Sequence, residues 1–475
     1  MRKGEVGNRF DSLFYVEKNL YQSFIKLSKI AKVSGGKRLP LVSDFAAAIT
    51  PWRYLRVGDI DWFGNLDYAN FNYLPEDVYN ALKRYEIVDN ELLIAIVGAT
   101  IGKVALLRKS KDENIILTEN CAKISIKGNT VLPEYLLIIM QSTLVQKQIQ
   151  LNYIQTTLPK LGLERLESLK IPPIPYVSVQ LKIVTLFETA QTSKKQKEAE
   201  AAELLASIDV YLLQALGIIL PKVSEKKDFF YTRSSKVSSG RIDPFYHQRE
   251  FEELEFSLKN GSYGIQNFFN IITYISSGAT PLKSNRENYY VDDIENGVPL
   301  LRVQNITAEG LKLDDVIYIN FETHEKDLKR SQVFGGDLLI TITGRIASSA
   351  VAPEKFEGNI NQHSVIVRTT ESCVLNEFLA IFFNSVLGQK IAIRKTTGGT
   401  RPALDYQALK SIKIPIPPLE KQTEIAIHIS KLRNRAKLLQ QQAVTELESA
   451  KQVVEKMILG FNYSVFKERQ DKVKA

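Results

Sequence analysis

Two long stretches of the chain repeat apolar residues at the spacing of an α-helix, from about 180 to 216 and from about 422 to 459. Each follows a short proline-rich segment and contains no proline. A helix of this length buries an apolar stripe only against a partner, so we predict that the two helices pair antiparallel. The alternative is that each folds back on its own globular part. The residues expected in helix pairing or partner docking are Phe187, Leu205, Leu212, Leu439, Leu447 and Val454.

Shorter runs rich in β-branched residues, bounded by Gly, Asn and Asp, predict strands outside the long helices. These runs are 92–97, 115–118, 123–127, 338–343 and 364–368. One amphipathic helix is predicted in each half of the chain, at 132–150 and 375–394. Each half therefore combines a mixed, β-rich globular part with a long helix, and the predicted fold class is α+β.

The predicted elements occur twice in the same order, about 243 residues apart. Arg56 in Leu-Arg-Val-Gly matches Arg302 in Leu-Arg-Val-Gln, and the proline-rich segment at Ile171 matches the one at Ile414. We infer a tandem duplication, with two β-rich domains separated by two antiparallel helices and related by a pseudo-twofold repeat. The expected boundaries are 1–175 and 221–418 for the domains, 176–220 and 419–462 for the helices, and 463–475 for a C-terminal tail.

Composition narrows the class of protein. A chain of 475 residues is too long for one ordinary core. Its net charge of +9 favours a polyanion partner, most commonly nucleic acid, although a merely basic soluble protein is the alternative. The two cysteines, Cys121 and Cys373, cannot build a disulfide framework or a cysteine-based zinc site. No apolar run has the length of a membrane span, so we expect a cytoplasmic protein without a membrane partner.

No motif in the sequence points to catalysis by this chain. The segment Gly98–Val104 resembles a phosphate-binding loop, but it has three residues between its glycines instead of four. It also has Val104 where Ser or Thr must hold magnesium, and its counterpart at Gly344 lacks the second glycine and the lysine. The proline-rich segments lack the Asn or Asp of an amino-methyltransferase motif, and the four histidines are scattered. We expect no catalytic residue, metal site or cofactor in this chain.

Long basic and amide side chains on turn-rich loops can reach phosphates and base edges. In the segment 394–401, small residues would let the backbone approach a phosphate between basic side chains. Arg56 and Arg302 have a rival interpretation as a structural salt bridge common to both halves. His363 is more simply a polar residue at a strand end than a DNA contact. The candidate DNA-binding residues are Lys37, Arg38, Arg53, Arg56, Lys103, Lys160, Lys283, Arg286, Arg302, Gln304, Arg345, Lys395, Thr400 and Arg401.

Two globular parts, each followed by a proline-rich gate and a long helix, resemble the DNA specificity subunit of a type I restriction–modification enzyme. The second gate, Ile-Pro-Ile-Pro-Pro-Leu-Glu-Lys-Gln ending at Gln422, fits the family pattern. The first keeps Gln180 but lacks the Leu-Glu pair. The turn at Gly98–Gly102 and the Asn361-Gln-His strand start also resemble family patterns. The resemblance covers nearly the whole chain, and it is specific because the motifs recur in a fixed order.

This resemblance implies two target recognition domains, each reading one half of a bipartite, asymmetric site on double-stranded DNA. The helices would set the gap between half-sites and dock two methyltransferase subunits, which carry S-adenosylmethionine. Two restriction/translocase subunits, using ATP and Mg²⁺, would complete the complex, and this chain would be non-catalytic. The rival hypotheses are a self-contained restriction–methylation enzyme, which the missing motifs disfavour, and a non-DNA coiled-coil scaffold, which the basic charge disfavours.

Overall fold

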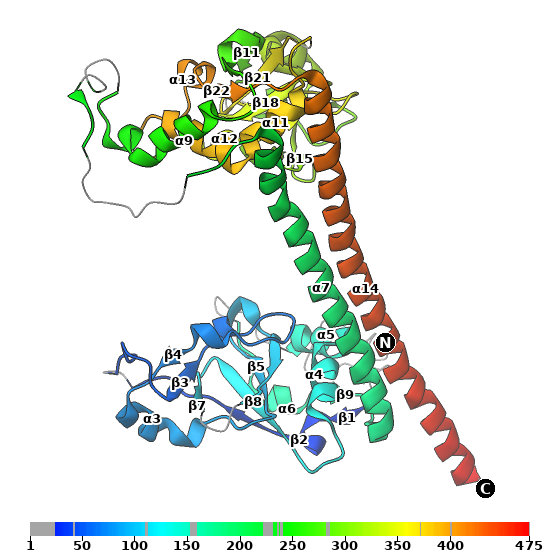
Figure 1. Cartoon of the computed structure of the whole chain (residues 1–475). Helices are drawn as coiled ribbons and strands as arrows, with labels where there is room; N and C mark the ends of the chain where they lie inside the picture. The colour runs from blue at the N-terminus through cyan, green and yellow to red at the C-terminus, as the bar shows by residue number, and fades with distance from the viewer. Residues whose placement is uncertain are drawn as a thin grey trace. The chain divides into compact units, whose positions relative to one another are not determined.

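The computed structural model describes residues 24–40, 43–109, 113–152, 159–221, 231–234, 237, 241–281, 286–370, 372–399 and 401–474, without the side chains of 286 and 461–474. The chain divides into two compact units, which we call unit 1 (residues 1–196 and 442–475) and unit 2 (residues 197–441). Each unit contains one globular part and a segment of each long helix (Figure 1).

The described strands of unit 1 are β1 (Ile25–Lys26), β2 (Ala31–Gly35), β3 (Trp52–Leu55), β4 (Asn72–Tyr73), β5 (Leu92–Ala95), β6 (Val104–Leu106), β7 (Asn114–Leu117), β8 (Cys121–Ile126) and β9 (Lys170–Ile171). Four of them form an antiparallel sheet in the order β2-β8-β5-β6. A second sheet has the order β4-β3-β7, with β3 parallel to β7, and β1 pairs with β9. The short helices are α2 (Leu27–Ile30), α3 (Glu76–Leu82), α4 (Pro133–Gln141), α5 (Thr143–Asn152) and α6 (Leu163–Glu167).

The described strands of unit 2 are β10 (Ile265–Asn267), β11 (Ile272–Ser277), β12 (Tyr290–Val291), β13 (Gly297–Leu301), β14 (Ile306–Thr307), β15 (Gly310–Leu311), β16 (Ile317–Asn320), β17 (Gln332–Phe334), β18 (Leu338–Thr341), β19 (Ser349–Val351), β20 (Glu357–Ile360), β21 (Ser364–Thr369) and β22 (Lys413–Pro415). Its short helices are α9 (Arg249–Lys259), α10 (Arg286–Tyr289), α11 (Asn376–Asn384), α12 (Val386–Lys395) and α13 (Tyr406–Lys410).

Unit 2 repeats the four-stranded sheet of unit 1 and the three strands of its second sheet, which confirms the duplication and the predicted strands. Its antiparallel sheet has the order β11-β21-β18-β19, matching β2-β8-β5-β6. Its second sheet, β12-β16-β13-β20-β17, again joins an antiparallel neighbour and a parallel one to its middle strand, β13. In each unit the parallel pair brings two strand ends, and the loops that follow them, to the same edge of the sheet.

The single amphipathic helix predicted in each half is wrong, because the structure has two. The chain leaves helical geometry at Ser142 and at Ser385, where ψ is 154° and 157°. Ser385 begins the next helix as its N-cap, since its side chain accepts a hydrogen bond from Gly388 N–H at 3.1 Å. The apolar periodicity continues across the break, so the pattern of hydrophobic positions alone does not reveal it.

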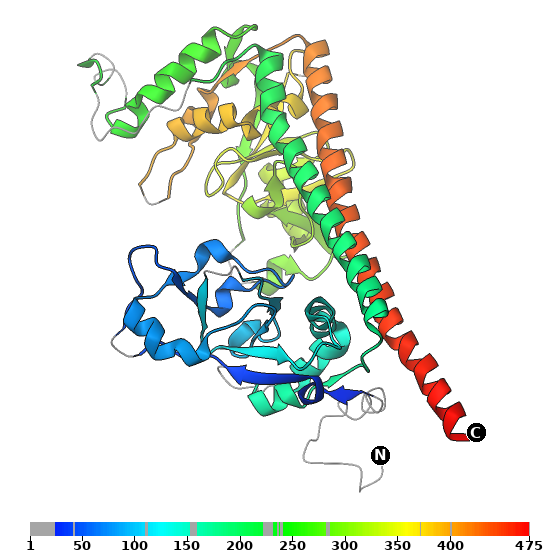
Figure 2. The same cartoon turned by 60° about the horizontal axis from the view of Figure 1, so that its bottom comes forward.

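The two long helices, α7 (Val177–Leu216) and α14 (Leu419–Lys474), lie side by side and antiparallel within each unit (Figures 1 and 2). In unit 1 the Ser193 hydroxyl donates to Glu446 at 2.9 Å. In unit 2 the ring of Tyr211 stacks on His428 with centroids 3.9 Å apart. Residue numbers rise along α7 where they fall along α14, which confirms the predicted antiparallel pairing.

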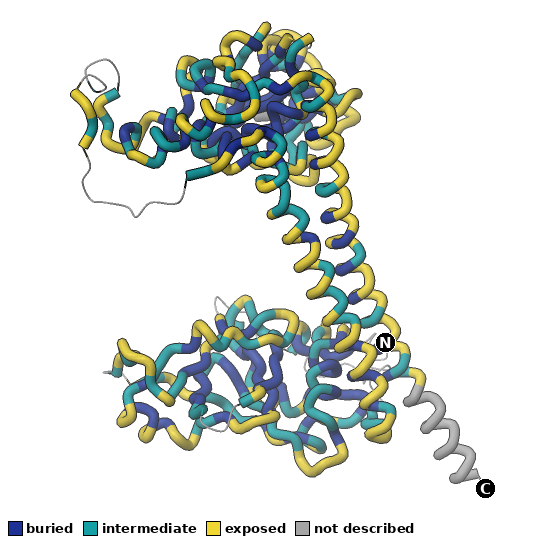
Figure 3. The backbone as a smooth tube through the Cα atoms, in the orientation of Figure 1, coloured by how far each residue is buried: buried dark blue, intermediate teal, exposed yellow. Residues whose placement is uncertain are grey.

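The apolar stripes of these helices contact both the other helix and the globular part. Phe187, Leu447 and Val454 are buried in the main core of unit 1, and Leu212 is buried in the main core of unit 2. Leu439 packs with Ala201 and Ala436, where the half-buried Leu205 also lies. The buried positions follow one side of each helix (Figure 3). Val454 occupies a buried place on this side of α14, whereas its neighbour Val453 is 45% exposed.

Gly217 and Gly460 each follow one of the two predicted helical stretches, and they behave differently. Gly217 ends α7 with a φ of +64°, and Ile218 N–H donates back to Leu213 at 2.9 Å, as in a Schellman cap. Ile218 is buried and Pro221 follows soon after, so the chain cannot continue as a helix. At Gly460 the helix α14 continues to Lys474, beyond residue 462 where it was expected to end.

A buried glutamine fixes the start of each long helix on its own globular part. In unit 1 the Gln180 carbonyl accepts from Leu132 N–H at 2.8 Å, and its amide donates to Thr130 and Pro175 oxygens, each at 2.8 Å. In unit 2 Gln422 makes the equivalent three bonds, to Leu375 N–H and to the carbonyls of Cys373 and Pro417. Both side chains are fully buried. This contact gives a structural reason for the glutamine shared by the two gates.

Candidate nucleic-acid interface

In unit 1, loops far apart in the sequence meet where the strands β5 and β7 end. Lys37 N–H donates to Leu117 at 2.8 Å, joining the loop after β2 to the end of β7. Ile96 N–H donates to Asn120 at 2.9 Å, and Leu161 N–H donates to Ile96 at 2.9 Å. We call this surface the loop edge of unit 1, formed by residues 36–40, 56–60, 96–103, 118–120 and 159–161.

Unit 2 builds the same edge, and the bonds from Ile342 and Leu404 are equivalent to those from Ile96 and Leu161 in unit 1. Asn361 N–H donates to Leu301 at 3.0 Å, Ile342 N–H donates to His363 at 2.9 Å, and Leu404 N–H donates to Ile342 at 2.9 Å. We call this surface the loop edge of unit 2, formed by residues 278–281, 302–305, 342–348, 361–363 and 401–404. Because main-chain bonds hold both edges, their side chains can differ without moving the backbone.

A glycine makes the closest backbone approach at each edge. A Cβ atom on Gly36 would lie 2.0 Å from the carbonyl oxygen of Thr118, and one on Gly278 would lie 1.9 Å from that of Ile360. Both distances are far inside van der Waals contact, so each loop can cross the end of the neighbouring strand only with glycine. These two glycines are therefore equivalent fixed points in the two units.

Several predicted cations of unit 1 gather on its loop edge. Lys37, Arg38 and Lys160 are exposed there, with their long side chains available to a phosphate backbone. The Arg38 Nε lies 2.6 Å from Glu119 Oε1, and this hydrogen bond raises the pKa of the arginine above its ordinary value. Lys103 is half-buried on the same edge, and its Nζ lies 5.8 Å from the centroid of the exposed Trp62 ring.

The other two candidates of unit 1 make contacts within the protein. Arg53 lies on β3, is mostly covered, and places Nη1 3.3 Å from Glu113. Arg56 N–H donates to the buried Asp59 carboxylate at 2.7 Å, which caps the turn η1 (Val57–Asp59). Burial raises the pKa of Asp59 above its ordinary value, although the bond from Arg56 N–H and the arginine charge oppose that rise.

Arg302 occupies the position of Arg56 but has a different acidic partner. Its N–H donates to Asn305 Oδ1 at 2.9 Å, capping the turn η8 (Val303–Asn305) as Asp59 caps η1. Its Nη2 donates to the Asp315 carbonyl at 2.7 Å, and Gln304 Nε2 donates to the carboxylate of Asp315 at 2.6 Å. The repeated Leu-Arg-Val motif therefore encodes a shared turn, while the salt-bridge partner differs between the units.

The predicted segment 394–401 of unit 2 is only partly available to a ligand. Arg394 is buried and donates to the Tyr246 carbonyl at 3.0 Å, so it does not flank a phosphate site as the sequence suggested. Lys395 is half-buried, with Nζ 5.8 Å from the Tyr246 ring centroid. Arg401 and Arg345 are exposed on the loop edge. Lys283, Thr400 and the side chain of Arg286 lie outside the described residues.

Sequence reasoning missed a buried acidic residue at the start of each central strand. In unit 1 Glu91 lies 3.4 Å from Lys123 Nζ, and in unit 2 Asp337 lies 2.6 Å from Arg368 Nε. Both acids immediately precede a Leu-Leu-Ile strand, a match that the sequence shows. They lie at the end of the sheet away from the loop edge, so they stabilise the fold.

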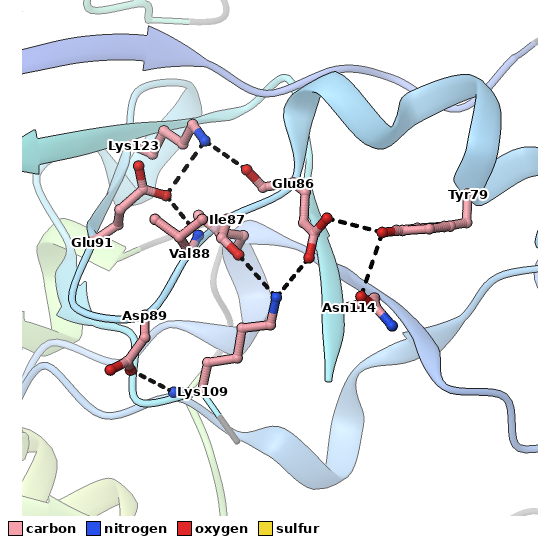
Figure 4. Close-up of polar contacts among 9 residues, drawn as sticks. All are labelled: Tyr79, Glu86, Ile87, Val88, Asp89, Glu91, Lys109, Asn114 and Lys123. Carbon is pink, nitrogen blue, oxygen red and sulfur yellow. Dashed lines mark hydrogen bonds and ion pairs between the residues drawn. The ribbon is translucent and has the colours of Figure 1, made fainter. Parts of the chain in front are cut away.

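In unit 1 a polar network extends from the ion pair of Glu91 and Lys123 (Figure 4). Lys109 Nζ lies 2.6 Å from Glu86, and the Tyr79 hydroxyl donates to the same carboxylate at 2.8 Å. Burial, together with the Glu86 charge, raises the pKa of Tyr79 to about 12.

In the part of the chain that the structure describes, no group of three His, Cys, Asp or Glu side chains could hold a metal ion, and no helix could span a membrane.

Comparison with known proteins gives a consistent result. The protein-family model of the type I restriction modification DNA specificity domain matches residues 44–204 and 262–449 of this chain. The EcoBI type I restriction enzyme specificity subunit of Escherichia coli is 28% identical over 30% of this chain and 30% of its own length. The putative MjaX specificity subunit of Methanocaldococcus jannaschii is 24% identical over 83% of each chain.

The fold also matches a solved structure. A chain from work on complex assembly and conformational transition of the type I R-M system has a TM-score of 0.57. The match covers 92% of this chain and 97% of that one, at 15% sequence identity. At this identity the likeness concerns the fold alone, and it supports two β-rich parts with a long helix pair.

Proposed function

Because this chain belongs to the type I restriction–modification DNA specificity family, we propose that it is the subunit that reads the DNA sequence, with one half-site for each unit. The observation that carries the proposal is the pair of equivalent loop edges. Each edge presents exposed basic side chains on a rigid main-chain frame, as phosphate contacts and base readout require. The two half-sites differ because the side chains on the two edges differ.

The cations divide into two groups by their environment. Lys37, Lys160, Arg345 and Arg401 are exposed and are proposed to contact phosphates. The side chains of Arg53 and Arg302 are only 23% and 31% exposed and are held by acidic neighbours, so DNA would have to draw a largely covered arginine out of an existing ion pair. We therefore propose that these two arginines position the loop edge rather than contact DNA.

The helix pair is proposed to dock two methyltransferase subunits that carry S-adenosylmethionine. Since the residues that pair the helices are buried, docking must use other side chains. In unit 1 an apolar groove of about 710 Å³ runs between α7 and α14, lined by Leu181, Leu186, Ala190 and Ala450 among others. Leu181 and Leu186 are 51% and 38% exposed, although both are large and apolar.

We propose that two restriction/translocase subunits, using ATP and Mg²⁺, complete the complex in the cytoplasm. In this division of labour the present chain is non-catalytic and sets which DNA is methylated or cut. The net charge of +9 favours DNA as a partner over a scaffold role that uses the helices alone.

A salt titration of DNA binding tests the proposal against the scaffold alternative. The chain, purified with its methyltransferase, is titrated with duplex DNA at several salt concentrations. Contact with several phosphates predicts an affinity that falls steeply and linearly on a log–log plot as salt rises. Absence of binding, or binding without any salt dependence, would reject the DNA-reading role.

A further inference from the structure

The duplication allows side chains at the same point of the two loop edges to be compared directly. Gly36 follows β2 and Gly278 follows β11, and each is the point at which the loop crosses a neighbouring strand end. Two residues later stand Arg38 in unit 1 and Thr280 in unit 2. Both are exposed, and they occupy equivalent positions on the two edges.

A second pair of positions corresponds in the same way. Ile96 follows β5 and Ile342 follows β18. Their N–H groups donate to the backbone oxygens of Asn120 and His363, respectively. Glu119 and Gln362 immediately precede these two acceptors, so they too are equivalent.

In each unit the two positions bond to one another. Arg38 donates to Glu119 at 2.6 Å, and the Thr280 hydroxyl donates to Gln362. The same place on the same frame thus holds a charged pair in unit 1 and a neutral pair in unit 2. The Arg38 side chain is 75% exposed and that of Glu119 is 30% exposed. Thr280 and Gln362 are exposed as well, so core packing does not dictate either choice.

Each pair is chemically complementary to one kind of base pair in the major groove. A G·C pair offers the O6 and N7 acceptors of guanine beside the N4 donor of cytosine, which suit an arginine and a glutamate. An A·T pair offers N6 and N7 of adenine to a glutamine amide, and the thymine methyl group to a threonine methyl. The ligand chemistry therefore changes between the units while the backbone does not.

We propose that residues 38 and 119 in unit 1, and residues 280 and 362 in unit 2, are equivalent base-reading pairs, the first specific for G·C and the second for A·T. This inference rests on the proposed function and names the side chains that carry specificity. The exposed cations nearby, Lys37 and Lys160 in unit 1 and Arg345 and Arg401 in unit 2, hold the adjacent phosphates without selecting bases.

The test exchanges the pairs between the units. Cells that contain the matching methyltransferase express the full-length chain as wild type, as Arg38→Thr with Glu119→Gln, or as Thr280→Arg with Gln362→Glu. A genome-wide map of N6-methyladenine then gives the split motif of each chain. The first exchange is expected to shift one base pair of the unit 1 half-site from G·C toward A·T. The preference should change by about 10-fold or more.

The reciprocal exchange is expected to shift one base pair of the other half-site from A·T toward G·C. It keeps the test decisive if the first variant fails to fold. A matched control is Arg108→Thr with Glu134→Gln, which removes another exposed Arg–Glu pair of unit 1, at the far end of the same sheet. This control should leave the motif unchanged.

Exchange variants that methylate the wild-type motif would overturn the pair assignment, and so would changes in the opposite half-sites. A wild-type map without any split motif would instead count against the proposed function itself. The two failures are therefore distinguishable.

Discussion

Unit 1 and unit 2 share the strand order, the glutamine that anchors each long helix and the glycine that closes each loop edge. They differ in the exposed side chains on that edge. Arg38 and Glu119 form a charged pair in one, where Thr280 and Gln362 form a neutral pair in the other. The comparison teaches that the frame is retained by main-chain and buried contacts, which leaves the outer side chains free to encode two different readings.

The largest expected effect concerns the buried seam between α7 and α14, where Leu439 packs against Ala201. Leu439→Asp should lower the free energy of unfolding by about 3–5 kcal/mol, because it buries a carboxylate without a partner. Leu439 is 2% exposed and its neighbour Leu438 is 45% exposed, so Leu438→Asp is a matched control with an effect within about 0.5 kcal/mol. Urea denaturation measures both, and an equal loss in the two variants would refute the assigned seam.

A second prediction asks whether the anchoring glutamines are equivalent. Gln422→Leu and Gln180→Leu should each cost about 2–3 kcal/mol, because buried backbone groups lose their hydrogen-bond partners. Gln440→Leu changes an exposed glutamine on the same helix α14 and should be nearly neutral. Thermal unfolding of the three variants decides the matter. A loss confined to one of the two buried positions would show that the units are anchored differently.

A third prediction concerns the exposed cations at the edge of unit 2. Arg401→Ala should weaken DNA binding several-fold and reduce the slope of log affinity against log salt by about 1, as the loss of one phosphate contact requires. Lys259→Ala removes an exposed lysine at the end of α9 and should leave the slope unchanged. Salt titration of both variants provides the measurement. If both variants changed the slope equally, the binding would reflect general charge and not the loop edge.

The smallest effect tests whether the units can exchange a buried residue. Asn305 caps its turn as Asp59 does, so Asp59→Asn should change the unfolding free energy by about 0.5 kcal/mol or less. Burial raises the pKa of Asp59, so ionisation costs stability in the folded state. The sign follows: as the pH rises above the ordinary pKa of Asp, the variant should gain relative to wild type.

Denaturation of Asp59→Asn at several pH values from mildly acidic to neutral provides the measurement. Asp44→Asn changes an exposed carboxylate in the same unit and should show no such trend. A relative loss of stability in Asp59→Asn as the pH rises would contradict the assigned effect of burial.

Much of the frame could be predicted from the sequence. Runs of β-branched residues and the repeat indicated the two β-rich parts, and the apolar spacing indicated the antiparallel helices. The breaks at Ser142 and Ser385 escaped, because apolar periodicity continues through them and only local capping interrupts the helix. The sequence did not predict that α7 ends at Gly217 while α14 continues past Gly460, because the residues that follow a glycine decide whether it ends a helix.

The loop edge was harder to predict. A sequence shows which residues are basic, but it does not show which of them is neutralised by a neighbour. Arg394 proved to be buried and Arg53 paired, whereas Arg345 and Arg401 are exposed. Glu119 was missed as part of the site because its relation to Arg38 depends on two loops that meet only in the fold.

The central claim is that this chain sets the DNA sequence read by a methylating complex, one half-site for each unit. The most direct measurement is a genome-wide map of N6-methyladenine in cells with and without the chain, the matching methyltransferase being present in both. The account predicts a split motif, with two unlike halves and an unspecified gap, that disappears when the chain is deleted. A set of methylated motifs that is the same in both cells would contradict it.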